Sequence, residues 1–162
     1  MARRAATLGA NGRAAVILDA SVAVKWFLPD EDGVAEAGHL RSAMLSGSVE
    51  LVAPDIIWAE VCQSLVRAVR RGRMDRDAAR AVVDDLGEVR PLIPDSSVDL
   101  RDAVRVALAT GLSAYDAQYL ALGARLGQPV ITADRRMLDQ GRAQGFEAVW
   151  LGDLPGLAGD TP

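Results

Sequence analysis

The sequence predicts an α/β domain built on a mainly parallel sheet. Five short apolar runs alternate along the chain with longer segments that have the apolar spacing of helices. Such alternation is typical of βαβ units, in which a helix connects one strand to a parallel neighbour. The first run, AVILD, is almost continuously apolar, as expected for a strand buried on both faces. The predicted strands are residues 15–19, 50–54, 89–93, 129–133 and 147–151.

Apolar periodicity and capping residues predict the helices between these strands. Ser21 is a plausible N-cap for the helix that follows the first strand. Pro54 can open a helix, and the segment behind it has apolar residues at helical spacing before it ends at Gly72. Glycines also follow several of the other helical segments, as expected of C-terminal caps. The predicted helices are residues 21–28, 31–46, 55–72, 75–86, 96–109, 113–126 and 135–143.

The size and composition of the chain favour one globular domain. The chain has 162 residues, half of them apolar and a quarter charged, which is enough for a sizeable core. We expect a domain over residues 14–152, a flexible N-terminal extension over 1–13 and a loose tail over 153–162. No apolar run approaches the roughly 20 residues of a membrane span, and the first residues lack the apolar segment of a signal peptide. We therefore expect a cytoplasmic protein that does not bind membranes.

The reactive side chains exclude several kinds of site. Cys62 is the only cysteine, so the chain has no internal disulfide and no spacing of zinc ligands. His39 is the only histidine, which makes a histidine-based metal site or a serine triad improbable. A reducing compartment is the simplest setting for such a chain.

Arginines are concentrated in one part of an otherwise acidic chain. The net charge is −4, which argues against a generally basic nucleic-acid binder. Within one short stretch, however, six arginines occur, of which four are candidates for contact with RNA: Arg67, Arg70, Arg71 and Arg73. The alternative is a solvated helix end, where basic residues are favoured by the helix dipole.

Four carboxylates stand where α/β proteins bind ligands. Asp19 ends the first strand and Asp134 follows the fourth, and ligands bind beyond the carboxyl ends of parallel strands. If the second and third strands lie on one side of the first, and the fourth and fifth on the other, these two aspartates face each other. Asp116 lies near the start of the helix over 113–126, and Glu60 lies among the apolar residues of an earlier helix.

Each of these acids also has a purely structural interpretation. Asp19 could cap the turn after its strand, and Asp134 could N-cap the next helix. Asp116 lies three residues after Ser113, which is the spacing of a capping box. Glu60 could be an exposed helix residue. The functional interpretation depends on all four acids together.

A cluster of carboxylates needs a cation, because the charges would otherwise repel one another. Oxygen-only ligands suit a hard cation such as Mg²⁺ or Mn²⁺. Without a Ser, His or Cys nucleophile, such a site favours metal-assisted hydrolysis of a phosphodiester, and the metal would offset the repulsion between the acids and RNA.

Four segments carry a resemblance to a known family. They occur in the order LDASVAVKWFLPDE, APDIIWAEVCQSLVRAVRRG, LSAYDAQYLALGARLG and PVITADRRML. Together they resemble the PIN-domain ribonucleases, and among these the VapC-type toxins of toxin–antitoxin pairs. The similarity extends from about Val16 to Trp150.

The resemblance implies a three-layer α/β/α sandwich around a mainly parallel, five-stranded sheet. It implies an Mg²⁺ (or Mn²⁺) site that cleaves RNA, a homodimer, and an antitoxin whose tail occupies the groove of the active site. By motif, two hydroxyl residues, Ser21 and Thr132, help to order the site. The catalytic acids by motif are Asp19, Glu60, Asp116 and Asp134, and the three aspartates among them hold the metal.

Three alternatives to a toxin remain at this point. One is a PIN-domain nuclease of RNA processing or decay, which only a neighbouring antitoxin gene would distinguish from a toxin. Another is a non-catalytic binding module of the same fold, against which the four intact acids argue. A receiver-type phosphoacceptor would need an aspartate at the end of the third strand and a lysine after the fifth, and the chain has neither.

Overall fold

The computed structural model describes residues 14–29, 31–86 and 91–154. In this part of the chain, parallel strands form a central sheet of order β2-β1-β3-β4. The strands are β1 (Ala14–Leu18), β2 (Val49–Val52), β3 (Val130–Thr132) and β4 (Ala148–Trp150). The assumed order is therefore confirmed where it matters, because the predicted first and fourth strands, β1 and β3, are neighbours.

The register of the central strands brings their carboxyl ends together. Ile17 pairs with Val52 on one side and with Val130 on the other. The main-chain N–H of Asp19, one residue beyond β1, donates to the carbonyl of Ile131 at 3.2 Å. Since the strands are parallel, the loops that follow β1 and β3 leave the sheet at the same edge.

The predicted third strand, 89–93, is reduced to one bridge in the described part of the chain. Leu92 pairs with Val52, so this segment extends the sheet next to β2, while residues 89 and 90 lie outside the described residues. Leu92 is flanked by Pro91 and Pro94, which have no N–H to donate. In a parallel ladder the next donor on this side would be Pro94, so the pairing ends after one bridge.

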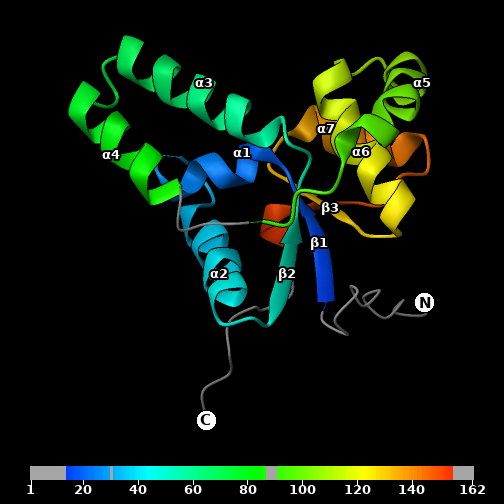
Figure 1. Cartoon of the computed structure of the whole chain (residues 1–162), viewed down its shortest axis with the longest axis horizontal. Helices are drawn as coiled ribbons and strands as arrows, with labels where there is room; N and C mark the ends of the chain where they lie inside the picture. Colours follow the sequence, from blue (N-terminus) through cyan, green and yellow to red (C-terminus); the bar gives the residue numbers. More distant parts are fainter. Residues whose placement is uncertain (1–13, 30, 87–90, 155–162) are drawn as a thin grey trace.

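Helices cover both sides of the sheet and give the predicted three layers. Helices α1 to α4 lie on one side and α5 to α7 on the other (Figure 1). Their bounds are α1 (Ala20–Ala23), α2 (Val34–Leu45), α3 (Ile57–Arg70), α4 (Arg76–Leu86), α5 (Leu100–Thr110), α6 (Ala114–Leu126) and α7 (Arg135–Ala143). Short 3₁₀ turns are η1 (Val24–Trp26), η2 (Ser96–Asp99) and η3 (Leu151–Asp153).

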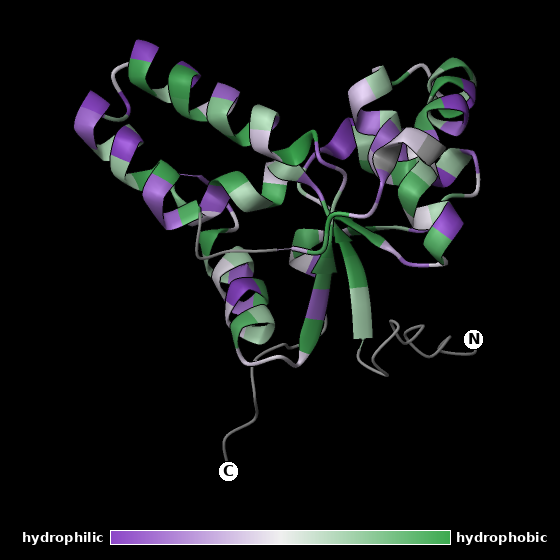
Figure 2. Ribbon diagram, viewed as in Figure 1, coloured by the Kyte–Doolittle hydropathy of each residue, from purple (hydrophilic) through white to green (hydrophobic). Residues whose placement is uncertain are grey.

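The hydropathy of each helix follows its place in the layers. The strands are mostly hydrophobic, whereas α3 and α4 alternate between hydrophobic and hydrophilic residues along their length (Figure 2). The buried residues of α3 recur at helical spacing and are Ile57, Val61, Leu65 and Ala68. Helix α6, in contrast, has a continuous buried run over 119–123, because its middle packs between the sheet and α5.

A glycine allows α6 to approach the sheet closely. A Cβ at Gly123 would lie 2.9 Å from the carbonyl oxygen of Gln128 and from a methyl group of Val130. Any larger residue would push α6 away from β3. This contact matters for the site described below, because the first turn of α6 carries Asp116.

The predicted ends of the domain are only partly described. The N-terminal extension, 1–13, lies outside the described residues, and so do residues 155–162 of the predicted tail. Asp153, the first residue of that tail, belongs to η3. Within the described residues, no helix combines the length and apolar character needed to cross a bilayer.

Candidate active site

The four predicted carboxylates line one groove at the carboxyl edge of the sheet. The groove has a volume of about 810 Å³. The four predicted acids come from four separate segments of the chain, and they are Asp19, Glu60, Asp116 and Asp134; Glu31 lines the groove as well. Among the residues that the structure describes, no three His, Cys, Asp or Glu side chains form a ready-made metal cage. The four acids therefore line the same groove, but they do not form a closed set of metal ligands.

Two hydroxyl groups fix the carboxylate of Asp19. Ser21 donates to Asp19 Oδ2, and Thr132 donates to the same oxygen at 2.7 Å although it lies 113 positions away. Each hydroxyl also accepts a main-chain N–H from the loop after β3, Ser21 from Ala133 and Thr132 from Asp134, both at 2.9 Å. The two hydroxyls thus connect Asp19 to the main chain that carries Asp134.

The predicted role of Ser21 as a helix N-cap is wrong. Helix α1 begins one residue earlier than expected, at Ala20, so that Asp19 is its N-cap residue and makes no side-chain cap. The hydroxyl of Ser21 is instead used between Asp19 and Ala133. Its second predicted role, ordering the site, fits this geometry.

Burial raises the proton affinity of Asp19. The residue is only 4% exposed, and desolvation raises the pKa of its carboxyl to about 6. The hydrogen bonds from Ser21 and Thr132 lower this pKa, while the negative charge of Asp116 raises it further. Asp19 and Asp116 are therefore close enough to repel each other across the groove.

Glu60 is held in the groove by a buried tyrosine and is not an exposed helix residue. It is half-buried, and the hydroxyl of Tyr119 donates to Glu60 Oε2 at 2.7 Å. Desolvation raises the pKa of Glu60, the Tyr119 hydrogen bond lowers it, and the charges of Asp19 and Asp116 raise it. The structural interpretation of Glu60 as a solvent-facing residue is thus incorrect.

Asp116 and Asp134 lie at helix starts and also line the groove. Ser113 N-caps α6 by accepting the N–H of Asp116 at 3.1 Å, and its hydroxyl donates to Asp116 Oδ2 at 2.8 Å. Asp134 Oδ1 accepts the N–H groups of Arg136 and Met137 at the start of α7. The cap by Asp134 is therefore confirmed, whereas the predicted capping box forms only its Ser113 half, and Asp116 accepts from the Ser113 hydroxyl instead. Both positions are compatible with a ligand, because a helix N-terminus favours negative charge.

Positive side chains also line this groove, and the charge of one of them, Arg67, lowers the pKa of Glu60. Three of the four predicted arginines, Arg67, Arg71 and Arg73, line it, whereas Arg70 does not. Lys25 from η1 also lines the groove. Arg67 and Arg70 do lie in the last turn of α3, so the helix-end interpretation holds as well.

Two side chains of the site received no functional role from the sequence. The ring of Tyr119 is fully buried, and its hydroxyl donates to Glu60 Oε2. Its position three residues after Asp116, on the same face of one helix, was the available signal. Lys25 is the single lysine of the chain, and nothing in its local sequence indicated that it would line the groove.

Comparison with known proteins gives consistent results. The model of the PIN domain family matches residues 16–143 of this chain. Ribonuclease VapC3 of Pyrobaculum aerophilum is 28% identical over 127 residues, which cover 77% of this chain and 93% of that protein. The crystal structure of PAE2754 from Pyrobaculum aerophilum matches with a TM-score of 0.60 at 24% identity, over 85% of this chain and 83% of that one. The structural match shows the same fold.

We expect the protein in EDTA to lose stability as the pH rises from about 4 to about 7. The folded pKa of Asp19 is about 6, above the usual value of the unfolded chain, so the folded state binds this proton more tightly. The stabilisation is complete below the unfolded pKa and is lost as the pH passes the folded pKa. The free energy of unfolding should fall by about 3 kcal/mol from this group, measured by urea unfolding at several pH values.

Two variants test the assignment of this effect. Asp19→Asn should remove most of the decrease, because Asn does not titrate and keeps the shape of the side chain. Asp139→Asn, on the exposed face of α7, should leave the decrease unchanged. The assignment is wrong if Asp19→Asn and wild type show the same pH dependence.

Proposed function

The chain belongs to the PIN domain family, and from this premise we propose that it is a cytoplasmic, metal-dependent endoribonuclease that acts as the toxin of a toxin–antitoxin pair. The observation that carries the proposal is the groove, in which four carboxylates at one end and several cations at the other face the same space. The name of its relative, ribonuclease VapC3, supports RNA as the substrate. An acidic end suits a metal, and a basic end suits a phosphate backbone.

The donor groups fit Mg²⁺ or Mn²⁺. All four acids supply oxygen, and hard cations prefer oxygen ligands. Because Mg²⁺ keeps several waters and takes only one or two carboxylates directly, a cage of three acids is not required. Asp19, Asp116 and Asp134 would hold the ion, and the repulsion between Asp19 and Asp116 is the charge that it would offset. When bound, the ion would supply positive charge beside the phosphate that is cleaved.

The residues of the chain have separate roles in this proposal. Ser21 and Thr132 keep Asp19 in one orientation, through contacts that the protein makes without any ligand. Tyr119 holds Glu60 Oε2, which leaves Oε1 to take a proton from water in the groove. Desolvation raises the pKa of Glu60 above its ordinary value, which makes its carboxylate a stronger base. Hydrolysis then adds water across one phosphodiester bond of the RNA.

The toxin role adds a protein partner to the proposal. We propose that a co-expressed antitoxin places its tail in the groove, where the carboxylates would attract a basic side chain. Growth arrest on expression of the toxin, relieved by a small neighbouring gene, would distinguish this role from RNA processing or decay. Growth arrest by wild type but not by Asp116→Asn would connect the effect to the groove.

A homodimer is the last part of the proposal, and α5 offers a face for it. Leu100, Val104 and Leu108 recur every four residues on one side of this helix, with 53%, 55% and 83% of their surface exposed. A stripe of three exposed aliphatic side chains is typical of a protein–protein contact.

We predict that Asp19→Asn, Asp116→Asn and Asp134→Asn each lower RNA cleavage by at least about 10- to 100-fold, because removal even of a group that only supports a metal ligand costs this much. Glu60→Gln should lower the rate by about 10²- to 10⁴-fold, as is typical of a lost general base. The assay is purified protein with total RNA in Mg²⁺ and in EDTA, followed by mapping of the cut ends. The aspartate variants should also gain less thermal stability from Mg²⁺ than wild type does.

Asp139→Asn serves as the control for these variants, because Asp139 lies outside the groove. It should cleave RNA like wild type and gain as much stability from Mg²⁺. Normal cleavage by Asp116→Asn would restrict Asp116 to its capping role. Absence of RNA cleavage by wild type in Mg²⁺ would favour a non-catalytic binding module.

A double variant tests the arginines of the groove. Replacing Arg67 and Arg71 by Gln should weaken RNA binding and reduce the slope of log affinity against log salt by about 0.7 for each lost phosphate contact. Arg70→Gln combined with Arg80→Gln removes the same charge outside the groove and should change the slope less. Equal slopes in the two double variants would favour the helix-end interpretation.

We expect Leu108→Gln to weaken a dimer, because it places a polar group in the apolar stripe of α5. Sedimentation equilibrium should then show a larger monomer fraction than in wild type. Leu45→Gln is the matched control, since Leu45 is 63% exposed on α2. If both variants show the assembly state of wild type, α5 is not the dimer face.

A further inference from the structure

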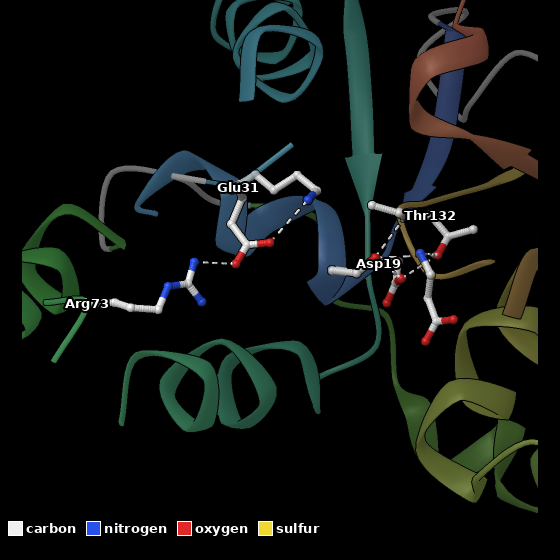
Figure 3. Close-up of polar contacts among 8 residues, drawn as sticks. Asp19, Glu31, Arg73 and Thr132 are labelled. Atoms are coloured by element: carbon white, nitrogen blue, oxygen red, sulfur yellow. Dashed lines mark hydrogen bonds and ion pairs between the residues drawn. The ribbon is translucent and has the colours of Figure 1, made fainter. Parts of the chain in front are cut away.

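At the basic end of the groove, one carboxylate bridges two cations. Glu31 Oε1 accepts from an Arg73 guanidinium nitrogen at 2.6 Å, and Glu31 Oε2 lies 3.6 Å from Lys25 Nζ. The hydrogen bond from Arg73 lowers the pKa of Glu31, and the charge of Lys25 lowers it further, so Glu31 is ionised at neutral pH. Figure 3 shows Glu31 and Arg73 well apart from Asp19 and Thr132.

The burial of these three residues is uneven. The side chain of Lys25 is only 9% exposed, whereas those of Glu31 and Arg73 are about 30% exposed. A lysine is seldom buried to this degree without a partner of opposite charge. The catalytic proposal uses neither Lys25 nor Glu31, yet both line the same groove as the four acids.

Helix α3 runs along the groove, so its rise per residue gives the distance between the two ends. Four residues at spacings of four, three and four positions lie on its groove face, and they are Glu60, Ser64, Arg67 and Arg71. A helix rises 1.5 Å per residue, so Glu60 and Arg71 are about 16 Å apart along the axis. An RNA strand cleaved at the acidic end would therefore place a phosphate remote from the cut beside the basic end.

We infer that Lys25 and Arg73 form a second phosphate subsite for RNA, and that Glu31 fills this subsite in the RNA-free protein. A carboxylate with two oxygens on two cations presents the charge and the geometry that two oxygens of a backbone phosphate would present. Among the described residues, the cations that line the groove are Lys25, Arg67, Arg71 and Arg73, and their charge attracts a polyanion. The inference rests on the proposed ribonuclease function and extends it to the contacts that hold the substrate away from the cut.

A purely structural role for Glu31 makes the opposite prediction. If Glu31 only connects η1 to the loop after α3, removal of its charge would destabilise the groove and weaken RNA binding. If Glu31 occupies a phosphate subsite, removal of its charge would take away a negative group that competes with the phosphate for Lys25 and Arg73, and RNA binding would become stronger. Glu31→Gln therefore distinguishes the two roles by the sign of its effect.

The experiment measures fluorescence anisotropy of a labelled ten-nucleotide single-stranded RNA in EDTA, so that no RNA is cut, over a series of KCl concentrations. Lys25→Met should weaken binding by about tenfold, the effect of one charge-assisted hydrogen bond, and should reduce the salt slope by about 0.7. Arg73→Met tests the same subsite at a more exposed position and should act in the same direction. Glu31→Gln should bind more tightly than wild type, with a steeper slope.

Arg80→Met is the matched control, because its side chain is 80% exposed on α4 and lies outside the groove. It should bind RNA like wild type, and thermal unfolding of every variant establishes that each is folded. The inference is overturned if Lys25→Met and Arg73→Met bind like wild type, or if Glu31→Gln binds more weakly. If wild type cleaves RNA but these variants bind RNA as wild type does, only the subsite is refuted. If wild type neither binds nor cleaves RNA, the proposed function is refuted too.

Discussion

The parallel pairing of β1 with β3 is the constraint on which the site depends. It places residues more than a hundred positions apart in the chain at one edge of the sheet, where Thr132 can reach Asp19. The two hydroxyls of Ser21 and Thr132 then satisfy the Asp19 carboxylate and the main-chain N–H groups of the next loop. A loss of this pairing would remove the Thr132 donor from a buried carboxyl, which costs more than the loss of one ordinary exposed hydrogen bond.

The groove combines stability and function in the same side chains. Asp134 and Ser113 cap helices, and Tyr119 is a core residue whose hydroxyl holds Glu60. In each case the element that needs the polar group for its own stability also fixes the direction of an acid. The acids are therefore oriented by the folded protein itself, which reduces the reorganisation needed when a ligand arrives.

Charge is distributed along the groove with opposite signs at its ends. The acids lie where the strands end, whereas the cations come from the later turns of α3, the turn after it and η1. The end with the acids suits a metal cation, and the end with the positive side chains suits a polyanion. Together they suit a nucleic acid that is bound through its backbone. The net negative charge of the whole chain conceals this local arrangement, because the charge is averaged over surfaces that face away from the groove.

The sequence by itself determined the helices, most of the strands and the identity of the four acids. These depend on local patterns, such as the 3.6-residue period of α3 and the acids at strand ends, which are visible without knowledge of the neighbours. Only the tertiary structure decided which partner each side chain has. Ser21 was predicted to be a helix cap, because its sequence neighbours give no signal of Ala133, whose N–H its hydroxyl accepts in the folded protein. In the described residues, the predicted third strand is one bridge at Leu92, because Pro94 cannot supply the next ladder donor. The separation of Arg70 from Arg71 depends on the direction in which α3 turns each side chain relative to the groove, and that direction is set by packing against the rest of the fold.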